Sequence, residues 1–344
     1  MSSGFISSEF YSRQSVLAEL GVSGQEELRR SKVTIVGLGG LGSVSALFLA
    51  LAGVGRMTLV DRDTVELSNL HRQVLYSLSD IRYPKVEAAE RRIHQVNPEI
   101  AIDPIPENLE PDNVESIIGQ SDCVVDGLDN METRYLINRH CVARKIPFVF
   151  GGAVGMEGNV AVFRTPETPC LECVLPGIGD RDLPTCDTRG ILGATAGIVG
   201  SVQAIEAIKV LAGIEPDSMG KLMVFDFVQS EFRTVKLAIR SDCEICQVKP
   251  HSLAAYKQRL AWLCGSGTVN VNPEKPTSID LEEFRKVIAE HHRVLLATPM
   301  VIVFDYGGRE ISLFRKGRML IKNVQNENEA LEVFRAVIQM ANLG

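Results

Sequence analysis

The chain has 344 residues, of which 45% are hydrophobic and 23% are charged, as in ordinary soluble proteins. The net charge of -7 and the pI near 5.5 argue against a nucleic-acid partner, because binding along a phosphate backbone needs a basic face. The longest uncharged stretch, 190–205, is too short to span a bilayer, and residues 1–5 do not resemble a secretory signal, so we expect a cytoplasmic protein without a membrane partner.

From residue 30 to about 165, short apolar runs alternate with amphipathic segments, which is the pattern of βαβ units. This pattern predicts a Rossmann-like α/β fold, a mostly parallel sheet with helices on both faces. The expected strands are 33–36, 57–60, 100–104, 123–126, 148–150 and 159–163, and the expected helices are 43–52, 84–97, 111–118 and 132–145.

Residues 164–190 lack periodicity and hold three cysteines, so they are expected to form a long functional loop. A helix over 195–211 and strands over 222–227 and 232–237 follow. The composition changes after residue 250, which predicts two domains, 1–250 and a small α+β domain over 251–344. In the second domain we expect a helix at 253–263, a linker made of 265–267 and the polar stretch 270–278, helices at 281–291 and 327–340, and strands at 294–296, 301–305, 311–314 and 319–321.

The first chemical signal is a glycine loop after the strand at 33–36. Gly37 permits a tight turn into the next helix, Gly39 and Gly40 let backbone N–H groups approach a phosphate, and Gly42 permits close helix packing. Asp61 ends the next strand, where a carboxylate accepts hydrogen bonds from a ribose. The loop therefore predicts a bound nucleotide, and on its own it is also compatible with NAD.

Polar residues that follow Asp61 favour a triphosphate over NAD. A site that splits a triphosphate must neutralise three phosphates with cations and a metal ion, whereas a dehydrogenase leaves its pyrophosphate to backbone amides. Asn69, Arg72 and Lys85 meet that demand, with Gln73 in the same run. The alternative interpretation is that Arg72 and Lys85 are solvated surface charges.

Two acids, Asp126 and Asp129, follow the apolar run at 123–125, where the ligand crevice of a doubly wound sheet lies. They suit Mg²⁺, which binds through one or two carboxylates together with phosphate oxygens. Asp129 and Asn130 also suit the N-cap of the following helix, and both roles are compatible.

Two CxxC pairs, Cys170 with Cys173 and Cys243 with Cys246, predict a closed structural Zn²⁺ site that pins two distant segments together. Redox pairs or buried thiols are the alternatives. Cys186 stands apart on the long loop, where a thiol is able to attack an activated carboxyl, although a single cysteine is usually unreactive. The remaining three, Cys123, Cys141 and Cys264, lie in apolar runs and are expected in the core.

Taken in order, these motifs resemble the MoeB/ThiF/HesA family and, more distantly, the activating enzymes of ubiquitin-like proteins. The resemblance covers about residues 8–248. It implies ATP-dependent adenylylation of the C-terminal glycine of a small ubiquitin-like sulfur carrier that ends in Gly-Gly, with release of pyrophosphate. The motifs are Tyr11-Ser12-Arg13-Gln14, the glycine loop, Asp61, Ser68-Asn69-Leu70-His71-Arg72-Gln73, Lys85, Asn97-Pro98, Asp126-Gly127-Leu128-Asp129-Asn130, the CxxC pairs, and 200–206.

The resemblance also implies roles for single residues. Gly40 approaches the ATP phosphates, Asp61 holds the ribose, and Arg72 and Lys85 contact the phosphates beside Asn69. Asp129 binds Mg²⁺, and Arg13 reaches the γ-phosphate in the site of a partner subunit, which implies a homodimer. Cys186 matches a loop cysteine that some members use covalently, which permits a thioester or persulfide step.

Two features depart from the family. Members commonly have a glycine three positions before the lysine, where this chain has Arg82. The segment 251–344 does not resemble a rhodanese-like sulfur-transfer domain. By its loose resemblance to the ubiquitin-fold domains of larger activating enzymes, it is expected to dock the carrier or a downstream enzyme, and a dimer-stabilising appendage is the alternative.

Two rival functions remain open from the sequence. One is a nicotinamide-dependent oxidoreductase, which the glycine loop and Asp61 favour. The other is a silent scaffold that binds nucleotide and partner without catalysis, and the presence of Arg13, Arg72 and Asp129 argues against it. The sequence does not choose among the molybdopterin, thiamine, tRNA-thiolation, cysteine-synthesis and protein-conjugation pathways.

Overall fold

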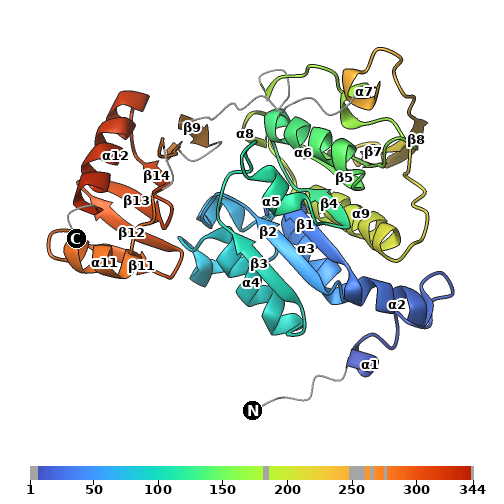
Figure 1. The fold of residues 1–344 in the computed structure, drawn as a ribbon, viewed down its shortest axis with the longest axis horizontal. Helices are drawn as coiled ribbons and strands as arrows, with labels where there is room; N and C mark the ends of the chain where they lie inside the picture. Colours follow the sequence, from blue (N-terminus) through green and yellow to red (C-terminus); the bar gives the residue numbers. More distant parts are fainter. Residues whose placement is uncertain (1–6, 181–185, 248–259, 264–266, 275–276, 342–344) are drawn as a thin grey trace. The chain divides into compact units, whose positions relative to one another are not determined.

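The computed structural model describes residues 7–180, 186–247, 260–263, 267–274 and 277–341, drawn in Figure 1. The chain divides into two compact units. Unit 1 comprises residues 1–62, 66–79 and 85–255, and unit 2 comprises 63–65, 80–84 and 256–344. The domain boundary predicted near residue 250 lies outside the described residues.

Unit 1 is built on an eight-stranded sheet with the order β3-β2-β1-β4-β5-β6-β7-β8. In this spatial order, the first five strands (β3, β2, β1, β4 and β5) run parallel to one another. The remaining neighbours, β5 with β6, β6 with β7 and β7 with β8, pair antiparallel. The strands are β1 (Lys32–Val36), β2 (Arg56–Val60), β3 (Ala101–Ile105), β4 (Cys123–Asp126), β5 (Phe148–Val154), β6 (Glu157–Phe163), β7 (Lys221–Asp226) and β8 (Glu231–Lys236).

Side chains that alternate along the strands of unit 1 form two apolar layers, because successive strand residues point to opposite faces. Ala161 and Phe163 of β6 pack in the same cluster as Ile137 of α6, whereas Val160 packs with Val199 of α9. Helices therefore cover both faces of the sheet, as predicted. The helices are α1 (Ser7–Phe10), α2 (Gly21–Arg30), α3 (Gly40–Ala52), η1 (Leu67–Asn69), η2 (Leu78–Asp80), α4 (Lys85–Val96), α5 (Val114–Ile118), α6 (Met131–Arg144), α7 (Leu171–Val174), α8 (Cys186–Arg189), α9 (Gly193–Leu211) and α10 (Glu244–Gln247).

The predicted helix over 111–118 is wrong in its first half, since α5 begins only at Val114. Asn113 explains the difference: its side-chain oxygen accepts from the Glu110 N–H at 2.8 Å, and its amide donates to the Asn108 carbonyl at 2.8 Å. These bonds stabilise a turn that competes with the helix. The other helices and strands predicted in unit 1 are confirmed within a few residues, while α1, α2, α7, α8, α10 and the short helices η1 and η2 were not predicted.

Unit 2 contains a six-stranded antiparallel sheet with the order β11-β12-β13-β14-β10-β9. Ile302 and Phe304 of β12 pack under the helices with Phe284 and Phe334, whereas Val301 and Val303 point to the opposite face. The elements are β9 (Leu260–Leu263), β10 (Thr268–Val271), α11 (Leu281–Ala289), β11 (Val294–Ala297), β12 (Val301–Tyr306), β13 (Arg309–Phe314), β14 (Met319–Lys322) and α12 (Glu327–Ala341).

Two predictions for unit 2 are wrong. Residues 260–263 form strand β9 rather than the end of a helix, and residues 268–271 form strand β10 within the predicted linker. A buried polar pair hides the strand pattern of β10, because Arg318 donates to the fully buried Asn270 side-chain oxygen at 3.0 Å. With this partner, a polar residue is tolerated in a buried strand.

Candidate nucleotide site and metal centre

The glycine loop joins β1 to α3 and touches the end of β4. Gly37 has φ +87°, and a Cβ at this position would lie 2.7 Å from the Gly127 carbonyl. A Cβ at Gly42 would lie 1.8 Å from the Gly37 oxygen, and one at Gly127 would lie 2.2 Å from it. Larger residues are therefore excluded at all three positions, which keeps the backbone of the loop close to the sheet edge.

Helix α3 begins directly at this loop. Its N-cap, Gly39, makes no side-chain capping bond, and the first turn carries no acid. The first N–H groups of a helix lack intrahelical partners and carry partial positive charge, so a bare N-terminus of this kind suits an anion. This geometry agrees with the phosphate site that the sequence predicts.

Asp61 lies beside the loop at the end of β2. Its carboxylate accepts from the Leu38 N–H at 2.7 Å, and the Tyr76 hydroxyl donates to the Leu38 carbonyl at 3.0 Å. Both groups of the Leu38 backbone are thus held by buried side chains. Asp61 therefore supports the shape of the glycine loop, in addition to the ribose contact that the sequence predicts.

Arg72 and Gln73 reach the same loop from the segment after η1. The Asn69 carbonyl accepts from the N–H groups of both residues at 3.1 Å. An added Cβ at Gly40 would lie 3.6 Å from Arg72 Cγ, and one at Gly39 would lie 4.0 Å from Gln73 Nε2. The buried Gln73 side-chain oxygen has no hydrogen-bond partner among the described residues, which leaves an acceptor beside the loop.

Lys85 is the first residue of α4 and is 95% buried, with 5% of its surface exposed. A lysine is rarely buried without polar partners, which makes the simple surface-charge interpretation wrong for this residue. Its contact with a nucleotide stays a prediction.

Asp126 is fully buried and is not placed like a metal ligand. It forms an ion pair with Arg134 at 2.9 Å and accepts from the Leu128 N–H at 2.8 Å. Burial raises the pKa of Asp126, and the Arg134 guanidinium and the Leu128 N–H oppose that rise. Of the two acids in this motif, Asp129 is the exposed one, so it is the carboxylate that suits Mg²⁺.

Asn130, rather than Asp129, caps the following helix. Its side-chain oxygen accepts from the Thr133 N–H at 3.0 Å at the start of α6. The cap, which the sequence left open between Asp129 and Asn130, is therefore Asn130, and none of the capping bonds described for α6 comes from Asp129. The structure describes no contact that joins Asp129 to the glycine loop.

Arg134 was missed by the sequence analysis, although it organises the segment that carries Asp129. Its guanidinium donates to the Leu128 carbonyl at 2.6 Å and to the Gly151 carbonyl at 2.8 Å, and it lies 5.1 Å from the centre of the Phe150 ring. One side chain thus ties the end of β4 to β5. Its position one turn after Asn130, on the buried stripe of α6, is the signal that reveals it.

We expect Arg134→Met to destabilise unit 1 by about 3–5 kcal/mol, because it leaves the buried Asp126 charge without its partner. Denaturant unfolding monitored by circular dichroism measures this change. The matched control is Arg144→Met on the same helix, which removes an exposed pair with Glu115 and should cost about 0–1 kcal/mol. Equal losses in both variants would contradict the positioning role.

In the N-terminal motif at 11–14, Tyr11 and Gln14 are anchored by hydrogen bonds, whereas Arg13 is exposed. The Tyr11 hydroxyl accepts from the Asn97 amide at 2.7 Å, and the Gln14 amide donates to Gln25 at 2.6 Å and to the Ala52 carbonyl at 2.9 Å. Arg13 lies between these anchors and is exposed. The described residues hold no contact between Arg13 and the glycine loop, which is compatible with a role outside its own chain.

The four cysteines of the two CxxC pairs meet in one cluster. All four sulfur atoms lie within 4.8 Å of one another, with separations of 4.0 Å for Cys170–Cys173, 3.7 Å for Cys170–Cys243 and 3.4 Å for Cys173–Cys246. A tetrahedral zinc with bonds of about 2.3 Å requires sulfurs about 3.8 Å apart. The cluster therefore fits Zn²⁺, with no fifth ligand from His, Asp or Glu among the described residues.

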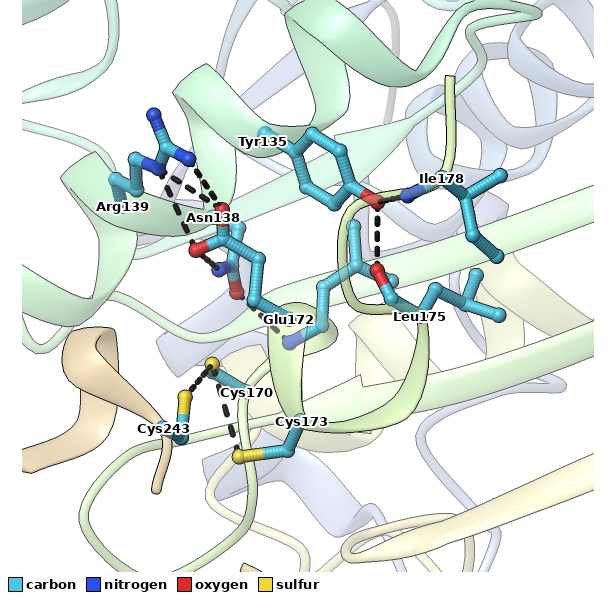
Figure 2. A network of polar contacts seen from close by, with 10 residues as sticks. Tyr135, Asn138, Arg139, Cys170, Glu172, Cys173, Leu175, Ile178 and Cys243 are labelled. Carbon is cyan, nitrogen blue, oxygen red and sulfur yellow. Dashed lines mark hydrogen bonds and ion pairs between the residues drawn. The ribbon is translucent and has the colours of Figure 1, made fainter. Parts of the chain in front are cut away.

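Helix α6 holds the first of these pairs in place, as Figure 2 shows. The Asn138 side-chain oxygen accepts from the Leu171 N–H at 2.9 Å, and Arg139 pairs with Glu172 at 2.6 Å. The Tyr135 hydroxyl donates to the Leu175 carbonyl at 2.6 Å and accepts from the Ile178 N–H at 2.9 Å. The same helix that carries Arg134 therefore supports the metal centre.

The other cysteines have different surroundings. Cys123 and Cys141 are buried, as predicted, and burial raises the pKa of each thiol. Cys186 begins the short helix α8, and its side chain lies outside the described residues, as does Cys264. A covalent role for Cys186 stays a prediction.

Comparisons with known proteins agree with this geometry. Residues 11–247 match the ThiF family. The chain is 38% identical over 291 residues to adenylyltransferase and sulfurtransferase MOCS3 of Culex quinquefasciatus, covering 83% of this chain and 66% of that protein. It is 41% identical over 239 residues to the sulfur carrier protein ThiS adenylyltransferase of Escherichia coli, covering 69% of this chain and 94% of that protein.

Among solved structures, E. coli MccB crystallised with MccA-N7isoASN superposes with a TM-score of 0.62 at 23% identity, over 70% of this chain and 76% of that one. This likeness concerns the fold. The chain spans just under two thirds of the length of the Culex relative, and it nearly spans the E. coli ThiS adenylyltransferase.

Proposed function

The chain belongs to the ThiF family, and from that premise we propose that it is an adenylyltransferase that activates a ubiquitin-like sulfur-carrier protein. The carrying observation is the bare N-terminus of α3, which suits a phosphate, with the aliphatic part of Arg72 packed next to Gly40 and its guanidinium donating to the Ser68 carbonyl at 3.0 Å in the adjacent segment. The E. coli relative named for the sulfur carrier ThiS supports a protein carrier as substrate.

In the proposed reaction, an oxygen of the carrier's C-terminal carboxylate attacks the α-phosphorus of ATP. A carboxyl–phosphate bond forms, the bond between the α-phosphorus and the bridging oxygen breaks, and pyrophosphate leaves with the electron pair. Negative charge grows on the phosphate oxygens, so catalysis depends on fixed cations and N–H donors.

The site residues divide these tasks. Gly37, Gly39, Gly40 and Gly42 shape the phosphate cradle, Asp61 accepts from the ribose, and Asn69 and Gln73 line the same segment. Arg72 and Lys85 neutralise the phosphates. Asp129 is the residue that would hold Mg²⁺, which supplies charge neutralisation at the phosphates when bound.

The cysteine cluster has a separate, structural task. Four thiolates leave no open position for a substrate at zinc, so the metal would hold 170–173 against 243–246 and take no part in phosphate chemistry. Zinc and magnesium are therefore assigned different roles in one unit.

A homodimer is the proposed assembly, with Arg13 serving the site of the partner subunit. Helix α9 supports this: by length and composition it is apolar enough to cross a membrane, yet half of it is buried within the chain. Ile198 and Ile205, two turns apart on α9, are 44% and 51% exposed. An apolar face of this kind on a core helix suits contact with a second copy.

We expect Ile198→Glu combined with Ile205→Glu to convert the dimer to a monomer, because two charges cannot be buried unpaired in an apolar interface. Analytical ultracentrifugation measures the mass. Val22→Glu on α2, where Val22 is 70% exposed, is the control and should stay dimeric. A monomeric wild-type chain would refute the dimer, and a double variant that stays dimeric would refute α9 as its interface.

Pyrophosphate exchange into ATP tests the activity against its rivals. We expect exchange only when a carrier ending in Gly-Gly is added. Turnover of NAD(P)H without exchange would establish the oxidoreductase instead, and nucleotide binding without either activity would establish the scaffold. The choice of pathway and a cytoplasmic location stay predictions.

A further inference from the structure

Unit 2 includes two short segments, 63–65 and 80–84, that pair with each other. The Val65 N–H donates to the Tyr83 carbonyl at 2.8 Å, and the Arg82 N–H donates to the Val65 carbonyl at 2.9 Å. A further bridge joins Thr64 to Pro84. These bonds close the base of the segment 66–79, which carries Asn69, Arg72 and Gln73, and they end directly before Lys85.

Arg82 occupies a backbone conformation that favours glycine. Its φ of +78° lies in the left-handed region, which is strained for a residue with a branched or long side chain. A glycine, which the family resemblance implies at this position, adopts this conformation without strain. The arginine in this chain keeps the same backbone shape in spite of the strain, so its side chain should contribute something that glycine cannot.

That contribution is an ion pair within unit 2. Arg82 Nε donates to a carboxylate oxygen of Glu310 on β13 at 2.8 Å, and the other Glu310 oxygen accepts from Lys322 Nζ on β14 at 3.0 Å. The Glu310 side chain is 18% exposed and so is shielded from solvent. Burial would raise the pKa of Glu310, but the bonds to Arg82 and Lys322 outweigh it, and the pKa is lowered.

We propose that the Arg82–Glu310 ion pair makes unit 2 a positioning element for ATP, by fixing the base of the segment that carries Asn69, Arg72 and Gln73. A segment whose two ends are already held loses less conformational entropy when its side chains order around a ligand. The inference rests on the proposed function, since it assigns those residues to ATP. It gives the C-terminal unit a task inside the catalytic cycle.

A purely structural ion pair would give a different result. Arg82 is 41% exposed, so the pair is only partly buried, and loss of a merely structural pair would change unfolding without changing substrate affinity. A positioning contact instead changes the KM for ATP and leaves the KM for the carrier and kcat nearly unchanged. Comparing the change in the KM for ATP with the changes in the KM for the carrier and in kcat therefore distinguishes a positioning contact from a purely structural one.

The test uses the full chain with Arg82→Met, Arg82→Gly, Glu310→Gln and the double variant Arg82→Met/Glu310→Gln. We expect each to raise the KM for ATP in pyrophosphate exchange about fivefold, as loss of a partly buried ion pair of about 1 kcal/mol implies. The double variant should match Glu310→Gln, because both proteins have lost the Arg82–Glu310 ion pair and the Glu310 charge that pairs with Lys322. Arg82→Gly should also melt no lower than Arg82→Met, since it relieves the strain.

The control is Glu329→Gln, which removes the pair between Arg309 and Glu329 in the same unit, 2.9 Å apart, without touching 80–84. Its KM for ATP should stay within twofold of wild type. Calorimetric titration with ATP gives a second readout. If wild type binds ATP without exchange, the proposed function fails while the calorimetric constants still test the ion pair.

The inference would be overturned if Arg82→Met and Glu310→Gln had the same KM and Kd for ATP as the control Glu329→Gln. A wild-type chain that binds no ATP would overturn both proposals. A fivefold change in both variants that also appears in the KM for the carrier would contradict specific positioning of ATP.

Discussion

Lys85→Ala is expected to abolish pyrophosphate exchange, with a loss of about 10²–10³-fold or more in kcat/KM, the range for removing one group that stabilises transition-state charge. Lys85 is buried at the start of α4, where an ammonium keeps its charge only with anionic or polar partners. A phosphate that gains charge in the transition state depends on that cation more than the ground state does.

The buried position of Lys85 requires a check on folding. Lys85→Arg and Lys85→Met should be compared with Lys85→Ala by thermal melting, and Lys286→Ala, an exposed lysine on α11, controls for loss of a charge. We expect Lys286→Ala to exchange at the wild-type rate. Exchange retained in a folded Lys85→Ala protein would remove Lys85 from the catalytic set.

Loss of the metal is the second large effect. We expect Cys173→Ser to lose zinc and to destabilise unit 1 by about 4 kcal/mol, since the Cys170–Cys243 contact closes a loop with a sequence separation of 73 residues. Elemental analysis gives zinc per chain, and melting with and without a chelator gives the stability. Because the zinc site is closed, exchange at a temperature where the variant is folded should persist.

Cys123→Ala is the matched control for the metal, because Cys123 is buried but lies in β4 outside the cluster. It should keep one zinc per chain. A wild-type chain that contains no zinc, with a melting temperature that a chelator does not change, would contradict the assignment.

The strands of unit 1 were predictable because apolar runs alternate there with helical spacing and with glycine or proline punctuation. In unit 2, strands β11 to β14 were also predicted, but β9 and β10 were not, and in β10 Asn270 places a polar residue inside a buried strand. The partner that allows it, Arg318, is distant in the sequence. A local pattern does not reveal such a pair, so β10 was predicted as a linker.

The same reason explains what the sequence missed at the site. Some signals are local in the sequence: the positions of the glycines, the acids at strand ends and the CxxC spacing. Each of these indicates a chemical role without knowledge of the folded structure. Arg134 acts through Leu128 and Gly151, which join it only in the folded chain. Arg82 was visible as a departure, but its φ and its Glu310 partner were not.

The central claim is that the carrier's terminal carboxylate becomes an acyl-adenylate. The most direct measurement is the intact mass of a carrier ending in Gly-Gly after incubation with the chain, ATP and Mg²⁺, with inorganic pyrophosphatase present. We predict a carrier heavier by one AMP moiety, and no change in a carrier lacking its last glycine. An unmodified full-length carrier, with ATP intact under conditions where the chain is folded, would contradict the claim.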